Sequence, residues 1–305
     1  MHSPSLAAAL LAALLSSCAL SAQGTSPPPV NLAVTRCDGC AEWNEPQRPV
    51  RVHGNTWYVG TRGLSAILIT SPAGHVLIDG GLPESAPLIA ASVRALGFRL
   101  EDVKVLLNSH AHFDHAGGLA ALQRASGADV LLHPWSARML RLGTALPEDP
   151  QYALALPFPG VRARRELADR EVVRVGDVEI TAHFTGGHTP GGTSWSWRSC
   201  DGTDCRDIVY ADSQTPIAED GFRFSSNTRY PTVLRDFERG HARLESLPCD
   251  ILMAPHPGAV QLFERLARRD AGDANALRDP TACRAYVRTA RERLAQRLTT
   301  ERSPK

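Results

Sequence analysis

The sequence predicts an α+β protein with a four-layer α/β/β/α sandwich in a single domain. The first observation is the order of elements, since two β-rich halves each carry flanking helical segments. The second is size, because 305 residues with 43% hydrophobic content can bury a sizeable core. No residue-level repeat relates the two halves, so the prediction depends on the order of the elements.

The first half is predicted to run β-β-β-α-β. Three runs rich in β-branched residues are separated by Gly and Pro and are typical of a strand meander, at 56–60, 65–70 and 75–80. A helical pattern covers 84–97, and the run V-K-V-L-L-N predicts the next strand at 103–108.

A helix over 118–125 and a strand over 129–133 are expected next. The stretch at 143–160 is rich in Pro and is long for a plain connection. We expect it to be a functional loop or flap, and its apolar residues suit the lining of a cleft.

The second half repeats this plan. Its predicted elements are strands around 171–185, 193–199 and 206–211, a helix over 231–246, a strand over 250–254 and a final helix over 280–298. Trp195 and Trp197 alternate with Ser on one strand, which is typical of a surface that faces the core.

The first part of the chain is predicted to direct export. Residues 1–22 contain an apolar run that is too short to span a membrane and ends in small residues, as secretory signals do. An extension over 23–50 and a domain over 51–305 follow, with regular structure expected from Asn55. We therefore expect a periplasmic protein; alternatively, Cys18 lies in a lipobox-like L-S-S-C and would anchor a lipoprotein.

Bulk charge gives no sign of a polyanionic partner. The chain has 33 Lys and Arg against 32 Asp and Glu, a formal net charge of +1. We expect no nucleic acid partner, no membrane span and a monomer.

One of the seven cysteines lies in the signal, and the even six that remain favour disulfides in an exported protein. Cys200 and Cys205 bracket a D-G-T-D turn and are predicted to be the rungs of a β-hairpin. Cys249 and Cys283 would join the last strand to the C-terminal helix. The C-D-G-C stretch at 37–40 is a local disulfide, a redox pair or half of a zinc ribbon.

The stretch H-A-H-F-D-H places three imidazoles and one carboxylate within six residues, namely His110, His112, Asp114 and His115. These ligand types suit Zn²⁺, and alternate positions of an extended segment project two histidines the same way. One ion takes three or four ligands, so the stretch forms half of one metal site or the shared edge of two. A His-rich surface patch without metal is the alternative.

His188 in T-G-G-H-T-P-G-G and His256 in A-P-H-P-G complete the candidate ligand set. Each follows a predicted strand among Gly and Pro, whose turns let the backbone come close to an ion. The six residues suffice for two sites with three protein ligands each and open positions for water, which indicates catalysis. The other histidines lack ligand spacing and are expected to be structural or solvated: His53, His75, His133, His183 and His241.

With these motifs the chain strongly resembles the metallo-β-lactamase fold superfamily from about residue 50 to the end. N-T-W-Y-V-G, Y-A-D-S, A-P-H-P-G and the pair Cys249 and Cys283 make it most similar to subclass B3. The resemblance implies two zinc ions per chain. It assigns one ion to His110, His112 and His188 and the other to Asp114, His115 and His256.

The resemblance also implies hydrolysis of the amide bond of penicillins, cephalosporins and carbapenems, which would confer antibiotic resistance. A metal-bound hydroxide would attack the carbonyl that one ion polarises, and the other ion would take the charge that develops on nitrogen. Asp114 would hold or relay the proton of the nucleophile. No covalent acyl-enzyme is expected.

Y-A-D-S at 210–213 allows more than one interpretation. In subclass B3 the resemblance places Ser213 near the metal-bound water, and the residue two positions later, here Thr215, at the substrate carboxylate. A Ser is expected there in many relatives, so Thr215 is a departure. In glyoxalase-like and lactonase-like relatives Asp212 would bridge both metals. Capping of the strand end is the structural alternative.

Two rival functions follow. A lactone or thioester hydrolase of the same fold would use Asp212 as a metal ligand, but export, disulfides and the lack of a basic patch for glutathione carboxylates weigh against it. A non-catalytic zinc-binding or scaffold protein would not need six ligands with open coordination positions.

Overall fold

The computed structural model describes residues 1–2 and 35–303. Almost all of the predicted signal, the first part of the extension and Cys18 lie outside the described residues. Among the helices in the described ranges, none combines the length and the apolar character needed to cross a lipid bilayer.

One sheet has the strand order β1-β2-β3-β4-β5-β6-β7, antiparallel from β1 to β4 and parallel from β4 to β7. Its strands are β1 (Val50–His53), β2 (Thr56–Tyr58), β3 (Ile67–Ile69), β4 (His75–Ile78), β5 (Val103–Leu107), β6 (Asp129–Leu132) and β7 (Arg165–Glu166). Both faces of the sheet are buried at its central strands β3 and β4. In β3, for example, Ile67 and Ile69 join the core between the sheets, whereas Leu68 joins the core under the helices.

The other sheet has the order β12-β11-β10-β9-β8. Its strands are β8 (Val172–Val175), β9 (Val178–Phe184), β10 (Thr193–Asp201), β11 (Asp204–Tyr210) and β12 (Ile251–Met253). Neighbours from β8 to β11 are antiparallel, while β12 runs parallel to β11. This sheet packs against the first sheet, and helix α6 (Val233–Ser246), which precedes β12 in the chain, lies on its outer face.

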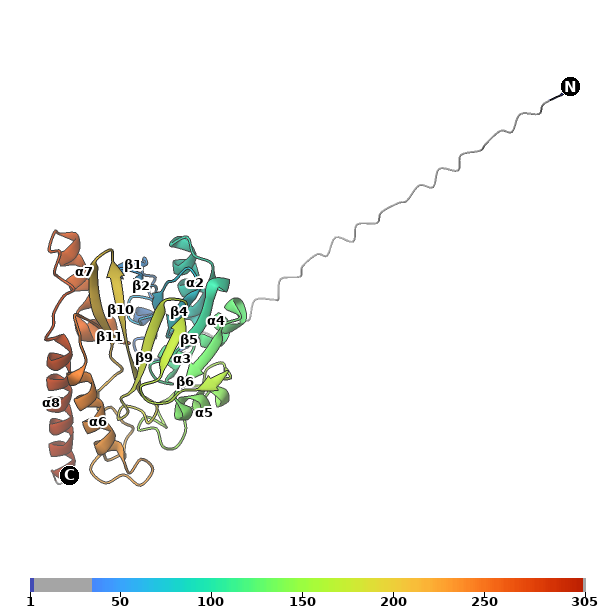
Figure 1. Cartoon of the computed structure of the whole chain (residues 1–305). Coiled ribbons are helices and arrows are strands. Elements are labelled where there is room, and N and C mark those ends of the chain that lie inside the picture. The colour runs from blue at the N-terminus through green and yellow to red at the C-terminus, as the bar shows by residue number, and fades with distance from the viewer. Residues whose placement is uncertain (3–34, 304–305) are drawn as a thin grey trace. The chain divides into compact units, whose positions relative to one another are not determined.

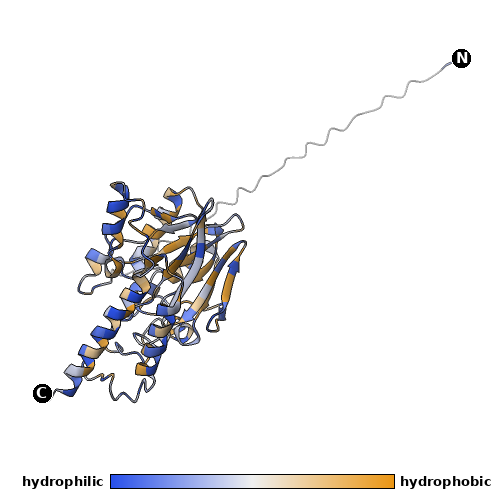
Figure 2. Cartoon of the chain, turned by 60° about the vertical axis from the view of Figure 1, so that its left-hand side comes forward, coloured by the Kyte–Doolittle hydropathy of each residue, from blue (hydrophilic) through white to orange (hydrophobic). Residues whose placement is uncertain are grey.

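Helices cover the outer faces of both sheets (Figure 1). On one side lie α2 (Ala86–Ala95), α4 (Leu119–Ser126) and α5 (Pro134–Leu142); on the other lie α6 (Val233–Ser246) and α8 (Ala282–Arg302). The remaining elements are α1 (Cys40–Trp43), α3 (Phe113–Ala116), α7 (Leu262–Asp270), η1 (Pro83–Ser85), η2 (Leu100–Asp102) and η3 (Pro257–Val260). Figure 2 shows hydrophobic residues gathered in the strands and hydrophilic ones along much of α8. The predicted α/β/β/α arrangement is confirmed.

The predicted core role of the two tryptophans of β10 is also confirmed. Trp195 is fully buried and Trp197 is 5% exposed. Their indole groups donate hydrogen bonds to the other sheet, from Trp197 Nε1 to Thr56 Oγ1 at 2.9 Å and from Trp195 Nε1 to the Asn108 carbonyl at 3.3 Å. The large side chains therefore join the sheets without leaving their polar atoms unpaired.

Three cysteine pairs lie at bonding distance within the described residues. Cys200 and Cys205 face each other across β10 and β11, as the turn between them predicts. Cys249, in the segment before β12, lies beside Cys283 of α8. The remaining pair closes the C-D-G-C stretch at 37–40.

The prediction that regular structure begins near Asn55 is wrong. β1 pairs with β2, with Val50 opposite Tyr58, and α1 precedes it. Two helices were also missed. α5 begins with Pro134, which is tolerated at the first position of a helix, and ends at Gly143 in the left-handed region. α7 is short and mostly polar, and its helical signal, Leu262 and Leu266 one turn apart on the buried face, was overlooked.

Candidate metal centre

The stretch at 110–115 follows β5 and is anchored by Asp79. This fully buried carboxylate accepts hydrogen bonds from Ser109 N (2.7 Å), Ser109 Oγ (2.7 Å), Asn108 Nδ2 (2.8 Å) and the Tyr210 hydroxyl (2.7 Å). Burial raises the pKa of Asp79. Because the partners come from both sheets, Asp79 fixes the start of the histidine stretch at the point where the sheets meet.

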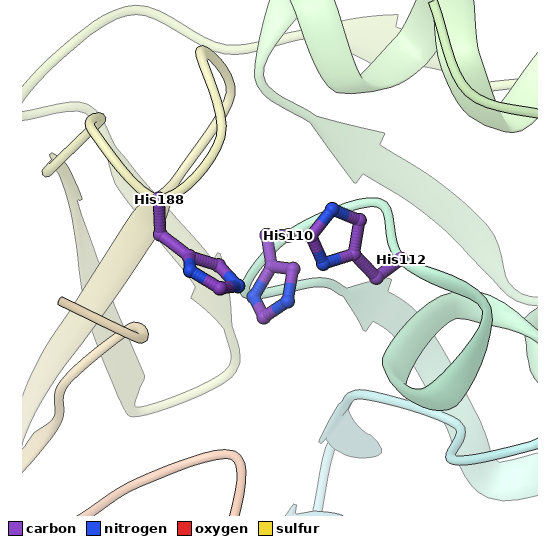
Figure 3. Close-up of side chains that lie close together, drawn as sticks. All are labelled: His110, His112 and His188. Carbon is purple, nitrogen blue, oxygen red and sulfur yellow. The ribbon is translucent and has the colours of Figure 1, made fainter. Parts of the chain in front are cut away.

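His110, His112 and His188 converge on one point (Figure 3). Ring centroids lie 4.7 Å apart for His110 and His112, 4.9 Å for His110 and His188, and 5.1 Å for His112 and His188. One ring nitrogen of each lies within 4.8 Å of the others. His188 occupies the turn between β9 and β10, where Gly187 has a φ of 134° and lies against Phe237. The structure thus brings together the three predicted ligands of one ion.

Each of these imidazoles has one nitrogen in contact with an oxygen of the chain. The contacts are His110 Nδ1 with Asp212 Oδ1 (2.7 Å), His112 Nε2 with Asp149 Oδ2 (3.1 Å) and His188 Nδ1 with the Thr215 carbonyl (2.8 Å). Such contacts orient metal-ligating histidines. In contrast, His110 Nε2 is buried and has no hydrogen-bond partner among the described residues. A buried polar atom needs a partner, so the cluster fits a metal ion.

Asp114 is the centre of a second cluster. Its Oδ2 lies 3.2 Å from His115 Nε2 and 3.2 Å from His256 Nε2. Ligand atoms of His110, Asp114 and His115 lie within 4.8 Å of one another, and His256 joins this group through Asp114. The centroids of His110 and His115 are 4.4 Å apart, so the two clusters adjoin.

Burial and neighbouring charges set the protonation of the clusters. Burial, reinforced by the adjacent imidazoles, lowers the pKa of His110 well below its usual range and that of His188 to about 3. Burial opposes ionisation of Asp114, but His115 outweighs it and holds the pKa of this carboxyl well below its usual range. His110 and His188 are therefore neutral and Asp114 is ionised, which are the states that metal ligation requires.

Both clusters line a cavity of about 1230 Å³, which Ser213 and Thr215 also line. The Thr215 hydroxyl lies 3.3 Å from His188 Nδ1, whereas the hydroxyl of half-buried Ser213 has no partner among the described residues. Asp212 Oδ1 contacts His110, and Asp212 belongs to neither cluster. The interpretation of Asp212 as a bridging metal ligand is therefore not favoured.

Asp149 and Gln151 belong to the site but were not predicted. Asp149 is fully buried; burial lowers the pKa of His112, but the charge and hydrogen bond of Asp149, together with the charge of Asp114, outweigh burial and raise this pKa. Gln151 Nε2 lies 3.3 Å from His188 Nε2. The sequence predicts a functional loop at 143–160, yet no spacing rule links the carboxylate of Asp149 to His112, which lies 37 positions earlier. The polar run P-E-D-P-Q within an otherwise apolar loop was the available signal.

The segment before β1 also reaches the site. The ring of Trp43, the last residue of α1, lies edge-on to His256 with centroids 5.2 Å apart. Trp43 lines the same cavity as the clusters. Because this segment was predicted to be irregular, its contribution to the site was missed.

Residues 59–205 match the family described as the metallo-β-lactamase superfamily. Among curated proteins, a hydroxyacylglutathione hydrolase of Anaeromyxobacter dehalogenans (strain 2CP-C) is 33% identical over 130 residues, which are 43% of this chain and 40% of that protein. A UPF0173 metal-dependent hydrolase of Anaeromyxobacter sp. (strain K) is 39% identical over 25% of each chain. The matched part thus spans less than half of these relatives.

Solved structures match over much more of the chain. The Rm3 metallo-β-lactamase is 52% identical with a TM-score of 0.86, over 88% of this chain and 100% of that one. MEM-A1, a subclass B3 metallo-β-lactamase from a soil metagenome library, is 49% identical with a TM-score of 0.83, over 85% and 98%. The metallo-β-lactamase SMB-1 is 42% identical with a TM-score of 0.81, over 85% and 99%.

Proposed function

The chain belongs to the subclass B3 metallo-β-lactamases, and from this we propose that it hydrolyses the amide bond of penicillins, cephalosporins and carbapenems. The observation that carries the proposal is the three-histidine cluster. One nitrogen of each imidazole contacts an oxygen of the chain, whereas His110 Nε2 is buried without a partner among the described residues. The cluster lines a cavity that Ser213 also lines. This activity would confer resistance to β-lactam antibiotics.

We propose zinc as the metal, with two ions per chain. The donor set of imidazole and carboxylate groups suits zinc. His110, His112 and His188 would hold one ion, and Asp114, His115 and His256 the other. When bound, zinc lowers the pKa of water to near neutrality and polarises a carbonyl group as a Lewis acid.

The residues of the chain position the reactants and handle the proton. Asp114, whose Oδ2 lies between two imidazoles, is placed to hold or relay the proton of the nucleophile. Ser213 offers the cavity a hydroxyl that no described residue binds, and Thr215 lies two residues later. The resemblance gives the carboxylate of the substrate to Thr215; because the Ser213 hydroxyl has no partner among the described residues, we propose that it binds this carboxylate too.

The test is hydrolysis of a chromogenic cephalosporin by purified, zinc-loaded protein, followed by one penicillin and one carbapenem. We expect turnover that a chelator abolishes and added zinc restores. An intact cephalosporin, or turnover that the chelator leaves unchanged, would refute the proposal. A homoserine lactone and a glutathione thioester in the same assay test the rival hydrolase, and we expect a much lower kcat/KM for both.

We also propose that the chain is a periplasmic monomer and that its three cysteine pairs are disulfides. The apolar run at 1–22 and the even number of cysteines after it support this. Lipid attachment at Cys18 is the alternative. Cell fractionation and the mass of the mature protein distinguish a cleaved, unmodified chain from a lipoprotein.

A further inference from the structure

The turn at 149–155, here called the flap turn, contacts two of the three clustered imidazoles. Asp149 contacts His112 at 3.1 Å, and Gln151 Nε2 lies 3.3 Å from His188 Nε2. A displacement of the flap turn would therefore remove the carboxylate that orients one imidazole and shift the amide beside another.

Apolar packing of the flap turn is limited to two small contacts, those of buried Pro150 and of Ala155, which packs on the core under the helices. Its two large apolar side chains, Tyr152 and Leu154, are 44% and 53% exposed. Internal bonds, such as those from Leu154 N and Ala155 N to the Gln151 carbonyl, shape the turn but do not attach it to the rest of the protein. Its placement therefore depends largely on polar contacts with other segments.

Glu219 supplies polar contacts of this kind. Its backbone N donates to the Pro150 carbonyl at 2.9 Å, and its Oε2 accepts a hydrogen bond from Ala153 N. Its other carboxylate oxygen, Oε1, forms an ion pair with Arg229 Nη2. Glu219 is only 9% exposed, so these contacts are largely shielded from water. One residue thus binds the flap turn on both sides of Gln151.

Arg229 is itself fixed against the flap turn. Its guanidinium carbon lies 6.0 Å from the ring centroid of Tyr152 and 5.6 Å from that of Phe222. Its backbone N donates to Asn227 Oδ1 at 2.9 Å. Arg229 therefore neutralises Glu219 from a defined position.

We propose that Glu219 and Arg229 form a latch that fixes the flap turn and thereby keeps Asp149 in contact with His112. Neither latch residue lines the cavity, so both act through the flap turn as positioning residues. The inference rests on the proposed metal-dependent function, because its effect is on the binding of the metal.

The experiment measures the dissociation constant of zinc by competition with a chromophoric chelator. We expect Glu219→Ala to raise this constant about tenfold, the lower end of the range for residues that support metal ligands. Glu219→Gln keeps an acceptor for Ala153 N but loses the charge, and Arg229→Met loses only the ion pair, so both should give smaller increases. The matched control is Glu179→Ala, which breaks the exposed pair of Arg174 and Glu179 and should change nothing.

A double variant distinguishes positioning from general stability. If the latch acts through Asp149, Glu219→Ala combined with Asp149→Asn should bind zinc as Asp149→Asn alone does. Additive losses would overturn the proposal, as would unchanged zinc binding in Glu219→Ala or, should that variant not fold, in Glu219→Gln and Arg229→Met. Because zinc binding is measured without substrate, the result is decisive even if the chain cleaves no β-lactam.

Discussion

Asp149 acts on the candidate metal centre indirectly, because its carboxylate contacts the imidazole of His112. Asp149→Asn keeps the size of the side chain and an acceptor oxygen but removes the negative charge that contacts His112. We expect the zinc dissociation constant to rise about 10- to 100-fold, measured by chelator competition. Asp177→Asn, in the exposed turn between β8 and β9, is the control. Equal zinc binding in both variants would contradict this role.

Ser213 and Thr215 differ in how free their hydroxyls are. Thr215 Oγ1 lies near His188 Nδ1, while the Ser213 hydroxyl has no partner in the described part of the chain. A hydrogen bond to a charged group contributes about 1.5–3 kcal/mol, so Ser213→Ala should raise KM about tenfold or more for substrates with a carboxylate. Thr215→Val should raise it less. Steady-state kinetics on one cephalosporin test this order, and the reverse order would contradict it.

The clustering of the candidate ligands could be predicted from the sequence, but the residues that support them could not. Four candidate ligands lie in one short motif, and His188 and His256 each follow a strand among Gly and Pro, which indicates them from the sequence alone. Asp149 and Glu219 lie in loops, and only the folded chain brings them to His112 and to the flap turn. Spacing along the chain does not encode such contacts.

Among the elements, α8 and the segment before β12 would be joined by the proposed disulfide of Cys249 and Cys283. In the chain-entropy model a cross-link over this separation of 34 residues contributes about 4 kcal/mol, against about 2 kcal/mol for the short loop of Cys200 and Cys205. We expect the double variant to Ala at Cys249 and Cys283 to lose more stability than the one at Cys200 and Cys205. Denaturant unfolding measures both, and equal losses would contradict the expectation.

The strands were easier to predict than the helices. Runs of β-branched residues between Gly and Pro gave the meander of β2, β3 and β4 because such runs fit a sheet that is buried on both faces. α5 was missed because it starts at Pro, and α7 because it is short and mostly polar, although Leu262 and Leu266 recur at helical spacing. Tertiary packing, which the pattern does not show, stabilises these two helices.

At the scale of the whole molecule, buried histidines away from the metal centre make stability depend on pH. Burial lowers the pKa of His133 and of His183 to about 4, below the ordinary 6.5. Between these values the unfolded chain binds protons that the folded chain does not, so stability falls as pH drops from about 6.5 to 4. Each histidine contributes roughly 2–3 kcal/mol to this loss.

Urea unfolding of metal-free protein at pH 7 and pH 4.5 measures this loss. His183→Gln removes one titrating group and keeps a partner for Ser196, which contacts His183 at 2.8 Å. We expect its free energy of unfolding to fall less between the two pH values than that of the unaltered protein. An identical fall would contradict the assignment.

The candidate ligands follow strands of both sheets, with His110 after β5, His188 between β9 and β10, and His256 after β12. An ion held among them would tie three distant stretches of chain together, and at a thousand times its dissociation constant it would add about 4 kcal/mol to the stability of the fold. A shortage of zinc would then abolish activity and also shorten the lifetime of the protein, because proteases cleave the transiently unfolded state, which is more populated in a less stable protein. Half-lives under a protease, with and without chelator, measure this consequence.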